Sequence, residues 1–216
     1  MDDATRSLLD LWDVTEDAVG AMAPPDWARR TPCPDMDVTD LVMHLAGVHY
    51  AGPDRLREGL AAGRARTAHR LADRTAGDRV LGAHCLDLCL HAHDLTSALG
   101  DPVDLAAHAP AALEACRLVV DVAPRLLVAA LGGRDATVRL VVHGADGGLE
   151  RTIHVVEGHT APPAGDAAAD VLEVEAGALL LLLAGRRDAD ALEAAGAARW
   201  SGSAADAFVH RARLVG

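Results

Sequence analysis

The sequence has very few aromatic side chains and no lysine. Phenylalanine, tryptophan and tyrosine together make up 2% of the chain, whereas apolar residues as a whole make up 50%. The hydrophobic core must therefore be built from alanine, leucine and valine, and side chains of this kind favour closely packed helices. All 20 basic residues are arginine. At 216 residues, the chain can bury one sizeable core or two small ones.

A basic surface is also missing, as is any long apolar run. The formal net charge is −12, which argues against a nucleic-acid partner because phosphate binding requires a basic face. No run of about 18 apolar residues exists, so we predict no membrane span. The sequence begins Met1-Asp2-Asp3, without the basic and apolar pattern of a signal peptide. We expect a cytoplasmic protein that acts on small molecules, and the sequence leaves its oligomeric state open.

The first part of the chain has the periodicity of helices. Helical spacing of apolar residues predicts four helices, over residues 3–23, from 38 to about 52, 83–99 and 110–131, with a kink at Pro124 in the last. Helices of this length with mostly short connections are typical of an up-and-down four-helix bundle. We therefore assign residues 1–132 to a helical bundle domain.

The period changes after Gly132-Gly133. Apolar and polar residues alternate over residues 138–142 and 149–155, which predicts a hairpin, and a further strand is predicted over residues 170–175. A core helix is expected over residues 178–183, which are strongly apolar, and a final helix over residues 203–214. A sheet with helices on one side is an α+β layer. We assign residues 133–216 to a small α+β domain, which makes the fold class of the whole chain α+β.

One stretch of the third predicted helix carries a pattern suited to chemistry. Asp87 and His91 are spaced i, i+4, so they lie one turn apart on the same helix face, and His84 precedes Asp87 by three residues. A carboxylate and an imidazole placed in this way can supply two ligands of a metal site. Such pairs are also frequent on helix surfaces as ordinary contacts. A third ligand from another element is needed to decide between the two interpretations.

His44 is the candidate for that third ligand. It lies in a helix that we expect to begin after the N-cap Asp37, with Asp40 in the first turn. It stands on the apolar stripe of this helix, where a buried, hydrogen-bonded histidine is the common alternative to a ligand. Facing helices of a bundle do assemble metal sites in this way. Together, His44, Asp87 and His91 would leave one tetrahedral position open, as catalytic zinc sites do.

The four cysteines contain no C-x-x-C pair, and a reducing cytosol would keep them as thiols. Cys85 and Cys89 share a helix face that is turned away from the candidate ligands, so we interpret both as small core residues. Cys33 stands between two prolines in a loop. It could approach the candidate metal site, although a buried structural position in the loop is favoured.

Two segments resemble a known family. Residues 31–45, TPCPDMDVTDLVMHL, preceded by Trp27, resemble the first signature of the mycothiol-dependent maleylpyruvate isomerases, a branch of the DinB-like helical bundles. Residues 87–100 resemble its second signature: an acid, a histidine four residues later, then Asp-Leu and a helix-ending glycine. Residues 170–193 resemble the sterol-carrier-like domain of many members. The chain departs from the family pattern at Met36, where an aromatic is usual, and at His93, where tryptophan is frequent.

The resemblance implies a divalent metal, usually zinc, on His44, Asp87 and His91. It also implies mycothiol as the thiol cosubstrate, whose sulfur the metal activates for addition to a small, electrophilic and acidic substrate. Isomerisation and thiol transfer are the two expected reactions. A hydrolase that uses metal-activated water and a non-catalytic small-molecule binding protein are the alternatives from other classes.

Arginines of the second domain are candidates for binding an acidic substrate. Arg186 follows the apolar run of residues 178–183, and Arg199 precedes Trp200. Guanidinium groups suit carboxylates because they donate two parallel hydrogen bonds. We name Arg186 and Arg199 as candidate catalytic residues, with simple surface solvation as the alternative for each.

Overall fold

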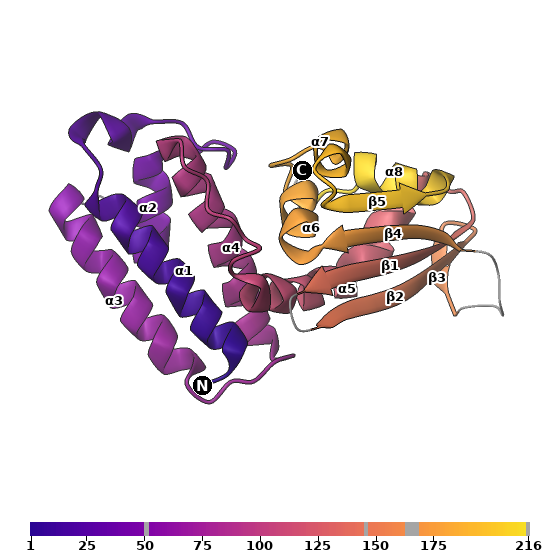
Figure 1. Ribbon diagram of the computed structural model, residues 1–216, viewed down its shortest axis with the longest axis horizontal. Helices are drawn as coiled ribbons and strands as arrows, with labels where there is room; N and C mark the ends of the chain where they lie inside the picture. The colour runs from indigo at the N-terminus through magenta and orange to yellow at the C-terminus, as the bar shows by residue number, and fades with distance from the viewer. Residues whose placement is uncertain (50–51, 145–146, 163–168, 215–216) are drawn as a thin grey trace. The chain divides into compact units, whose positions relative to one another are not determined.

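The computed structural model describes residues 1–49, 52–144, 147–162 and 169–214, and it divides into two compact units. The first comprises Met1–Ala111 and the second Ala112–Gly216. The first unit is helical and the second holds a five-stranded sheet with helices, so the α+β fold class is confirmed (Figure 1). Each unit is described by itself below.

The first unit is built from four α-helices: α1 Asp3–Gly20, α2 Val38–Ala46, α3 Pro53–Leu71 and α4 Arg79–Leu99, with a short 3₁₀ helix η1 Pro24–Ala28. Helices α1 and α4 overlap the predicted ranges, whereas α2 begins at the predicted residue but ends at Ala46 instead of near residue 52. Helix α3 was not expected, because its segment is rich in arginine and alanine and shows no clear apolar periodicity. Its buried side consists of only a sparse stripe that includes Leu56, Leu60 and Leu71.

Local signals determine the ends of the two helices that carry the candidate ligands. In α2, the Asp37 carboxylate accepts a hydrogen bond from the Asp40 N–H, and Gly47 ends the helix in the left-handed conformation at φ 66°. In α4, the Asp78 side chain caps the first turn, and Gly100 ends the helix at φ 94°. The sequence predicted the N-cap Asp37 and the helix end at Gly100, but it did not predict that α2 ends at Gly47 or that Asp78 caps α4.

Helix α3 supports α2 through a close contact. A Cβ atom at Gly59 would lie 2.9 Å from the Ala46 Cβ, which shows that α3 approaches α2 where a glycine leaves room. The Arg66 guanidinium donates a hydrogen bond to the Ala46 carbonyl at 3.0 Å, near the C-terminal end of α2. The unexpected helix is thus part of what positions the helix that carries His44.

The second unit holds a sheet with strand order β3-β2-β1-β4-β5. Its strands are β1 Ala136–Gly144, β2 Gly147–Val156, β3 His159–Ala161, β4 Asp170–Glu175 and β5 Ala198–Ser201. The predicted hairpin is β1–β2, which pairs antiparallel, while β1 and β4 pair parallel. Two residues of the predicted hairpin turn, 145 and 146, lie outside the described residues. Strands β3 and β5 are too short to have given a sequence signal.

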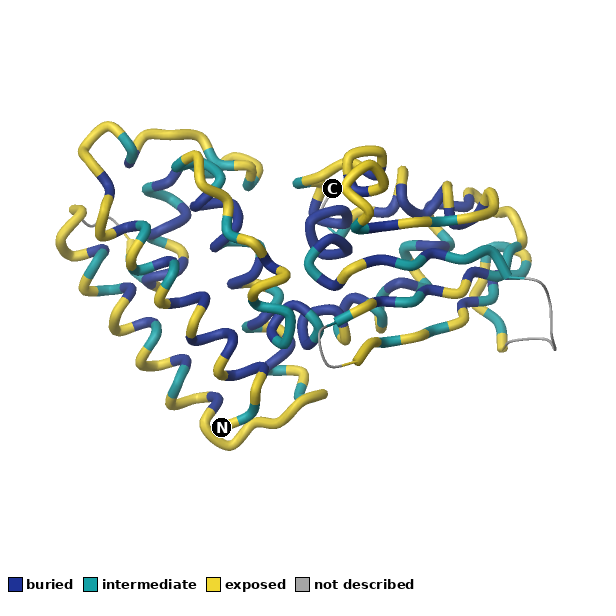
Figure 2. The backbone as a smooth tube through the Cα atoms, viewed as in Figure 1, coloured by how far each residue is buried: buried dark blue, intermediate teal, exposed yellow. Residues whose placement is uncertain are grey.

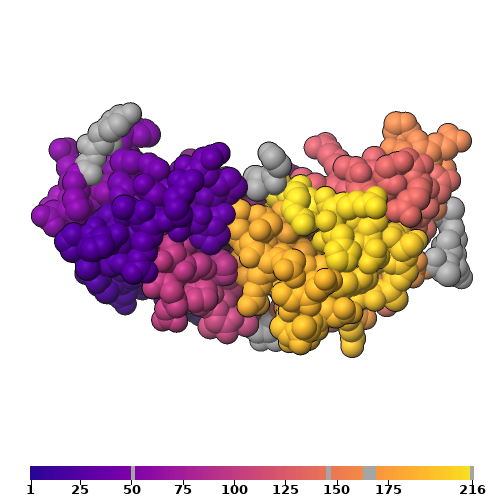
Figure 3. All heavy atoms as spheres, turned by 90° about the horizontal axis from the view of Figure 1, so that it is seen from above, coloured from indigo at the N-terminus to yellow at the C-terminus, as the bar shows by residue number. Residues whose placement is uncertain are grey.

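The helices of this unit are α5 Ala109–Leu131, which begins just before the boundary, α6 Ala176–Leu183, α7 Ala189–Ala194 and α8 Ser203–Arg211. Side chains alternate along β1, so Val138, Leu140 and Val142 face the core. Helices α6 and α8 contact strands β1 and β4. The apolar residues of α6 are buried, as the sequence predicted (Figure 2). Part of the C-terminal end of the chain, yellow in Figure 3, lies on the surface of this unit.

The structure draws its boundary one helix earlier than the expected division at residues 132 and 133. Most of α5 belongs to the second unit, and three hydrogen bonds show why. The Cys116 thiol donates to the Ala176 carbonyl, Arg151 donates to the Val120 carbonyl, and Arg211 donates to the Ala130 carbonyl. Over the described residues 1–49 and 52–111, the first unit still contains four complete α-helices, because α3 adds the helix that α5 does not supply.

Among the described residues, no helix combines the length and the apolar character that crossing a bilayer requires.

Candidate metal centre

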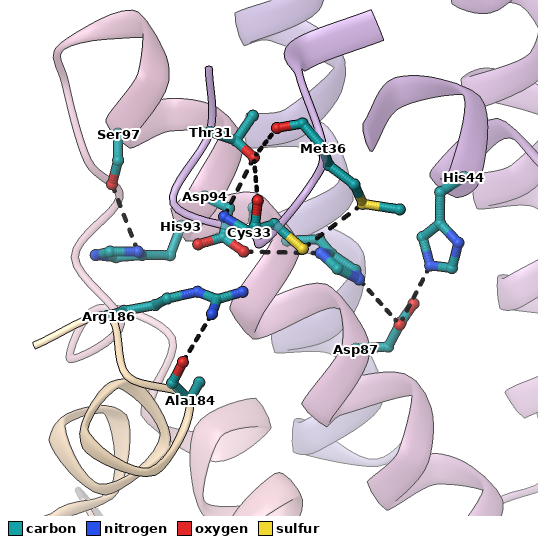
Figure 4. A network of polar contacts seen from close by, with 12 residues as sticks. Thr31, Cys33, Met36, His44, Asp87, His93, Asp94, Ser97, Ala184 and Arg186 are labelled. Atoms are coloured by element: carbon teal, nitrogen blue, oxygen red, sulfur yellow. Dashed lines mark hydrogen bonds and ion pairs between the residues drawn. The ribbon is translucent and has the colours of Figure 1, made fainter. Parts of the chain in front are cut away.

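Helices α2 and α4 bring His44, Asp87 and His91 together, and Figure 4 shows His44 beside Asp87. Asp87 and His91 lie one turn apart on α4, and the His91 Nε2 atom is 3.4 Å from the Asp87 Oδ1 atom. His44 approaches the same oxygen from α2, with its Nε2 atom also at 3.4 Å. The two imidazole rings meet edge to face with centroids 4.8 Å apart. Two nitrogen donors from different helices therefore converge on a single carboxylate oxygen.

The cluster opens to solvent on one side. The side chain of His91 is 15% exposed, whereas the side chains of His44 and Asp87 are 45% and 50% exposed. The sequence placed His44 on an apolar stripe, and Leu41 and Leu45 of that helix are indeed buried, while His44 itself is exposed. A small molecule could therefore reach the cluster from the His44 and Asp87 side.

The charges around Asp87 favour its ionised form. Burial raises the pKa of Asp87, but a hydrogen bond from His91 and the charges of His91 and His44 outweigh that effect and hold the pKa below its ordinary value. His84, one turn earlier on α4, has a pKa below its ordinary value, chiefly because it is partly buried and also because of Arg70, while Asp87 opposes the shift. The site thus holds a carboxylate beside imidazoles.

The donor set fits a divalent metal. Two imidazole nitrogens and one carboxylate oxygen are the protein ligands of many catalytic zinc sites, in which a fourth position stays open for a small molecule. The three ligand atoms all lie within 4.8 Å of one another, so small side-chain movements would bring them around one ion. When both imidazoles are neutral, the carboxylate is the one charged protein ligand, as in other sites with two histidines and a carboxylate.

Asp94 lies behind the cluster. It is fully buried, and its Oδ2 atom is 3.9 Å from the Nδ1 atom of His91, which is longer than a hydrogen bond. A carboxylate on the far side of a ligand histidine commonly orients the ring. His93 is buried on another side of α4, with its Nδ1 atom 3.4 Å from the Ser97 hydroxyl, and it does not join the cluster.

Cys33 is the residue whose position sequence reasoning underestimated. Its sulfur, an imidazole nitrogen of His91 and a carboxylate oxygen of Asp94 form a second group with metal-ligand spacing. The sequence favoured a structural position for Cys33 and only raised the possibility that it approaches the metal site. The single available signal was its place in a loop between two prolines, immediately before the helix that carries His44.

The candidate arginines both lie in the second unit. Arg186 follows α6 and donates a hydrogen bond to the Ala184 carbonyl at 2.7 Å. Arg199, on β5, forms an ion pair with Glu173 on the neighbouring strand β4. The catalytic roles suggested for Arg186 and Arg199 stay predictions.

The family model described as the mycothiol maleylpyruvate isomerase N-terminal domain matches residues 8–148. This range contains both ligand-bearing helices and all three residues of the candidate metal centre. No curated protein and no solved structure matches the chain.

Proposed function

Because that match covers more than half of its length, the chain belongs to the mycothiol maleylpyruvate isomerase family, and we propose that it is a zinc-dependent enzyme using mycothiol as its thiol cosubstrate. Its reaction is the isomerisation of a small electrophilic acid or the transfer of the thiol to such an acid. The proposal concerns the metal, the thiol, the substrate class and the reaction, all of which go beyond family membership.

The observation that carries the proposal is the convergence of His44 and His91 on the Asp87 oxygen. A surface ion pair needs only one histidine, whereas here two histidines from separate helices approach one oxygen. Two histidines and a carboxylate supply both the nitrogen donors and the negative charge that zinc requires. The exposure of His44 and Asp87 leaves the open side of the site accessible to a thiol and a substrate.

A divalent ion held by these residues would bind a thiol sulfur in its open position and keep it as a thiolate at neutral pH. The chain's own residues supply the rest. His44 and His91 must be neutral to offer a lone pair, and the ionised Asp87 balances part of the ion's charge. Asp94 lies behind His91, 3.9 Å from Nδ1, and at hydrogen-bond distance it would orient the ring.

The two reactions share their first step. The thiolate adds to an electrophilic carbon of the substrate, and the electron pair of the double bond moves to the conjugated carbonyl. In an isomerase, the bond that has become single rotates, and elimination returns the thiol with the double bond in the other configuration. In a transferase, protonation of the adduct gives the thiol conjugate as product. Both require an acid or carbonyl group that conjugates with the double bond.

An acidic substrate needs a cationic partner, for which we propose Arg186 or Arg199. The two differ in what already surrounds them. Arg199 is 79% exposed and paired with Glu173, so a substrate carboxylate would compete with that glutamate. Arg186 donates a hydrogen bond to the Ala184 carbonyl. Both arginines stay candidates for binding the substrate carboxylate.

The decisive experiment follows turnover and metal coordination in the full chain. Zinc-loaded protein is incubated with maleylpyruvate, the substrate in the family's description, with and without mycothiol, and in parallel with a conjugation acceptor that carries an activated double bond. We expect turnover that depends on both zinc and mycothiol. His44→Ala should abolish it, while His69→Ala, which removes an exposed histidine of α3, should not.

X-ray absorption at the zinc edge tests the proposed role of the thiol. Mycothiol should add a sulfur neighbour to the zinc, and it should do so equally in the Cys33→Ser chain, so that a protein thiol is not the source. Turnover that depends on zinc but not on the thiol would select the hydrolase alternative. If the chain shows no turnover and still binds maleylpyruvate after the metal is removed, the alternative of a non-catalytic binding protein is selected.

A further inference from the structure

A second group of potential ligands lies on the opposite side of the His91 ring from Asp87. The loop between η1 and α2 carries Cys33 and Met36, whose sulfur atoms are 3.6 Å apart (Figure 4). Cys33 Sγ, a nitrogen of His91 and a carboxylate oxygen of Asp94 have metal-ligand spacing. Neither Cys33 nor Asp94 belongs to the group formed by His44, Asp87 and His91.

The loop holds Cys33 in a defined position. A β-bridge between Arg30 and Asp37 closes the loop. Within it, the Thr31 hydroxyl donates to the Met36 carbonyl at 2.9 Å and accepts from the Cys33 N–H at 3.2 Å. The Met36 N–H donates to the Cys33 carbonyl at 3.3 Å. These contacts fix the backbone on both sides of the thiol, so its approach to α4 is built into the loop.

The His91 ring faces the two groups with different atoms. Its Nε2 atom lies 3.4 Å from Asp87, in the group that includes His44. Its Nδ1 atom is buried and, within the described part of the chain, makes no hydrogen bond, although the Asp94 carboxylate is 3.9 Å away. A buried imidazole nitrogen without a partner beside a thiol and a carboxylate is a place where a cation can be held.

We propose that Cys33, His91 and Asp94 form a second cation position, selective for thiophilic ions such as Cd²⁺. Thiolate and thioether ligands prefer soft ions, and the Met36 sulfur places a second soft donor beside Cys33. The group at His44 and Asp87 lacks sulfur and suits a borderline ion such as zinc. The two positions therefore differ in the kind of ion that they select.

The two positions compete for one imidazole. A neutral imidazole has one nitrogen with a free lone pair, while the other carries hydrogen, so His91 can serve one ion at a time. An ion on Nδ1 removes His91 from the group at His44 and Asp87. A thiophilic ion therefore inhibits the first position by withdrawing one of its three ligands, and it does so without displacing anything from His44 or Asp87.

Cadmium alone, titrated into the metal-free full chain, tests the second position by its thiolate-to-metal charge-transfer absorption in the ultraviolet. We expect the absorption to saturate at one ion per chain. It should be lost in Cys33→Ser and retained in His44→Ala, which removes a ligand of the first position only. The other three cysteines are fully buried, and burial raises the pKa of the Cys89 thiol to about 12, so Cys33→Ser identifies the thiol responsible.

Two results would overturn the proposal. Absorption that survives Cys33→Ser means that Cys33 does not bind the ion. Loss of absorption in His44→Ala, in protein whose circular dichroism is unchanged, means that Cys33 is a fourth ligand of the first ion and that no separate position exists. Zinc binding by Cys33→Ser, measured by elemental analysis, should stay at the level of the unmodified chain, which separates this test from the proposed zinc function.

Discussion

One histidine–carboxylate cluster in each unit invites comparison, because the two differ in what completes them. In the helical unit, Asp87 lies between the imidazoles of His44 and His91, with the same oxygen 3.4 Å from each Nε2. In the sheet unit, Glu173 on β4 lies 3.8 Å from the His143 imidazole on β1, and it also accepts a hydrogen bond from Arg199, directly opposite on β5.

The arginine makes the difference between the two clusters. A guanidinium is permanently charged, so Glu173 already has a counter-charge, and a metal would have to displace it. The imidazoles around Asp87 can release their protons and become ligands. Consistently, the two groups with metal-ligand spacing among the described residues lie in the helical unit, and neither contains Glu173. Similar residue types thus give a surface ion pair in one unit and a potential metal centre in the other.

The largest effect expected from this comparison is on metal content. His91→Ala removes a ligand from both groups of the helical unit and should abolish stoichiometric zinc binding, whereas His143→Ala should leave zinc content unchanged. Elemental analysis after dialysis against zinc-free buffer measures both. Equal zinc content in the two variants would show that the clusters do not differ as proposed.

The carboxylates should follow a graded order. Asp87→Asn removes the anionic ligand and should weaken zinc binding most, while Asp94→Asn removes a group behind His91, for which losses of about 10–100-fold are typical. Glu173→Gln should have no effect. Competition with a chromophoric chelator gives the three affinities. If Asp94→Asn proved more damaging than Asp87→Asn, the assignment of Asp87 as the ligand acid would be wrong.

The elements that hold the candidate ligands could be predicted because their signals are local. The i, i+4 spacing of Asp87 and His91 defines one helix face, and the capping residues Asp37 and Gly100 mark helix ends. That His44 faces this pair was predicted from the family resemblance and from the logic of facing helices. The structure places the three side chains within ligand distance of one another. Their role as metal ligands and the presence of zinc stay predictions.

Tertiary packing explains what the sequence did not reveal. The apolar side of α5 must be buried, but periodicity does not say against which partner, and the structure packs it in the sheet unit. Cys33 reaches His91 because the Arg30–Asp37 bridge folds a loop back towards α4, and no local pattern specifies that approach. Helix α3 was missed because its buried stripe is sparse and interrupted by Gly63 and Thr67.

Packing at α3 gives a third prediction, about how the helical unit keeps its cluster together. Gly59→Ala places a Cβ 2.9 Å from the Ala46 Cβ and should destabilise the fold by about 1–3 kcal/mol through overpacking. Gly20→Ala, at the end of α1, meets nothing within 4 Å and should be neutral or slightly stabilising. Urea denaturation measures both free energies of unfolding. A neutral Gly59→Ala would mean that α2 can shift freely, and the His44 position would then not be fixed by α3.

The smallest expected effect is a dependence of the free energy of unfolding on pH, caused by His84, which lies one turn before Asp87 on α4. The pKa of His84 is lowered in the folded chain from 6.5, mainly by burial. As the pH falls through 6.5, the unfolded chain therefore binds a proton before the folded chain does, and the free energy of unfolding decreases. The decrease ends below the folded-state pKa, where both states are protonated.

His84→Gln removes this titration and should flatten the corresponding part of the stability curve. The lowered pKa of Asp87 acts in a separate range, because its contribution is lost only at lower pH, as the carboxylate becomes protonated. Denaturation of the metal-free chain and of His84→Gln from neutral pH downwards isolates the histidine as the difference between two curves. Parallel curves would show that His84 is as solvated in the folded state as in the unfolded state, and that α4 is more open beside Asp87 than the structure indicates.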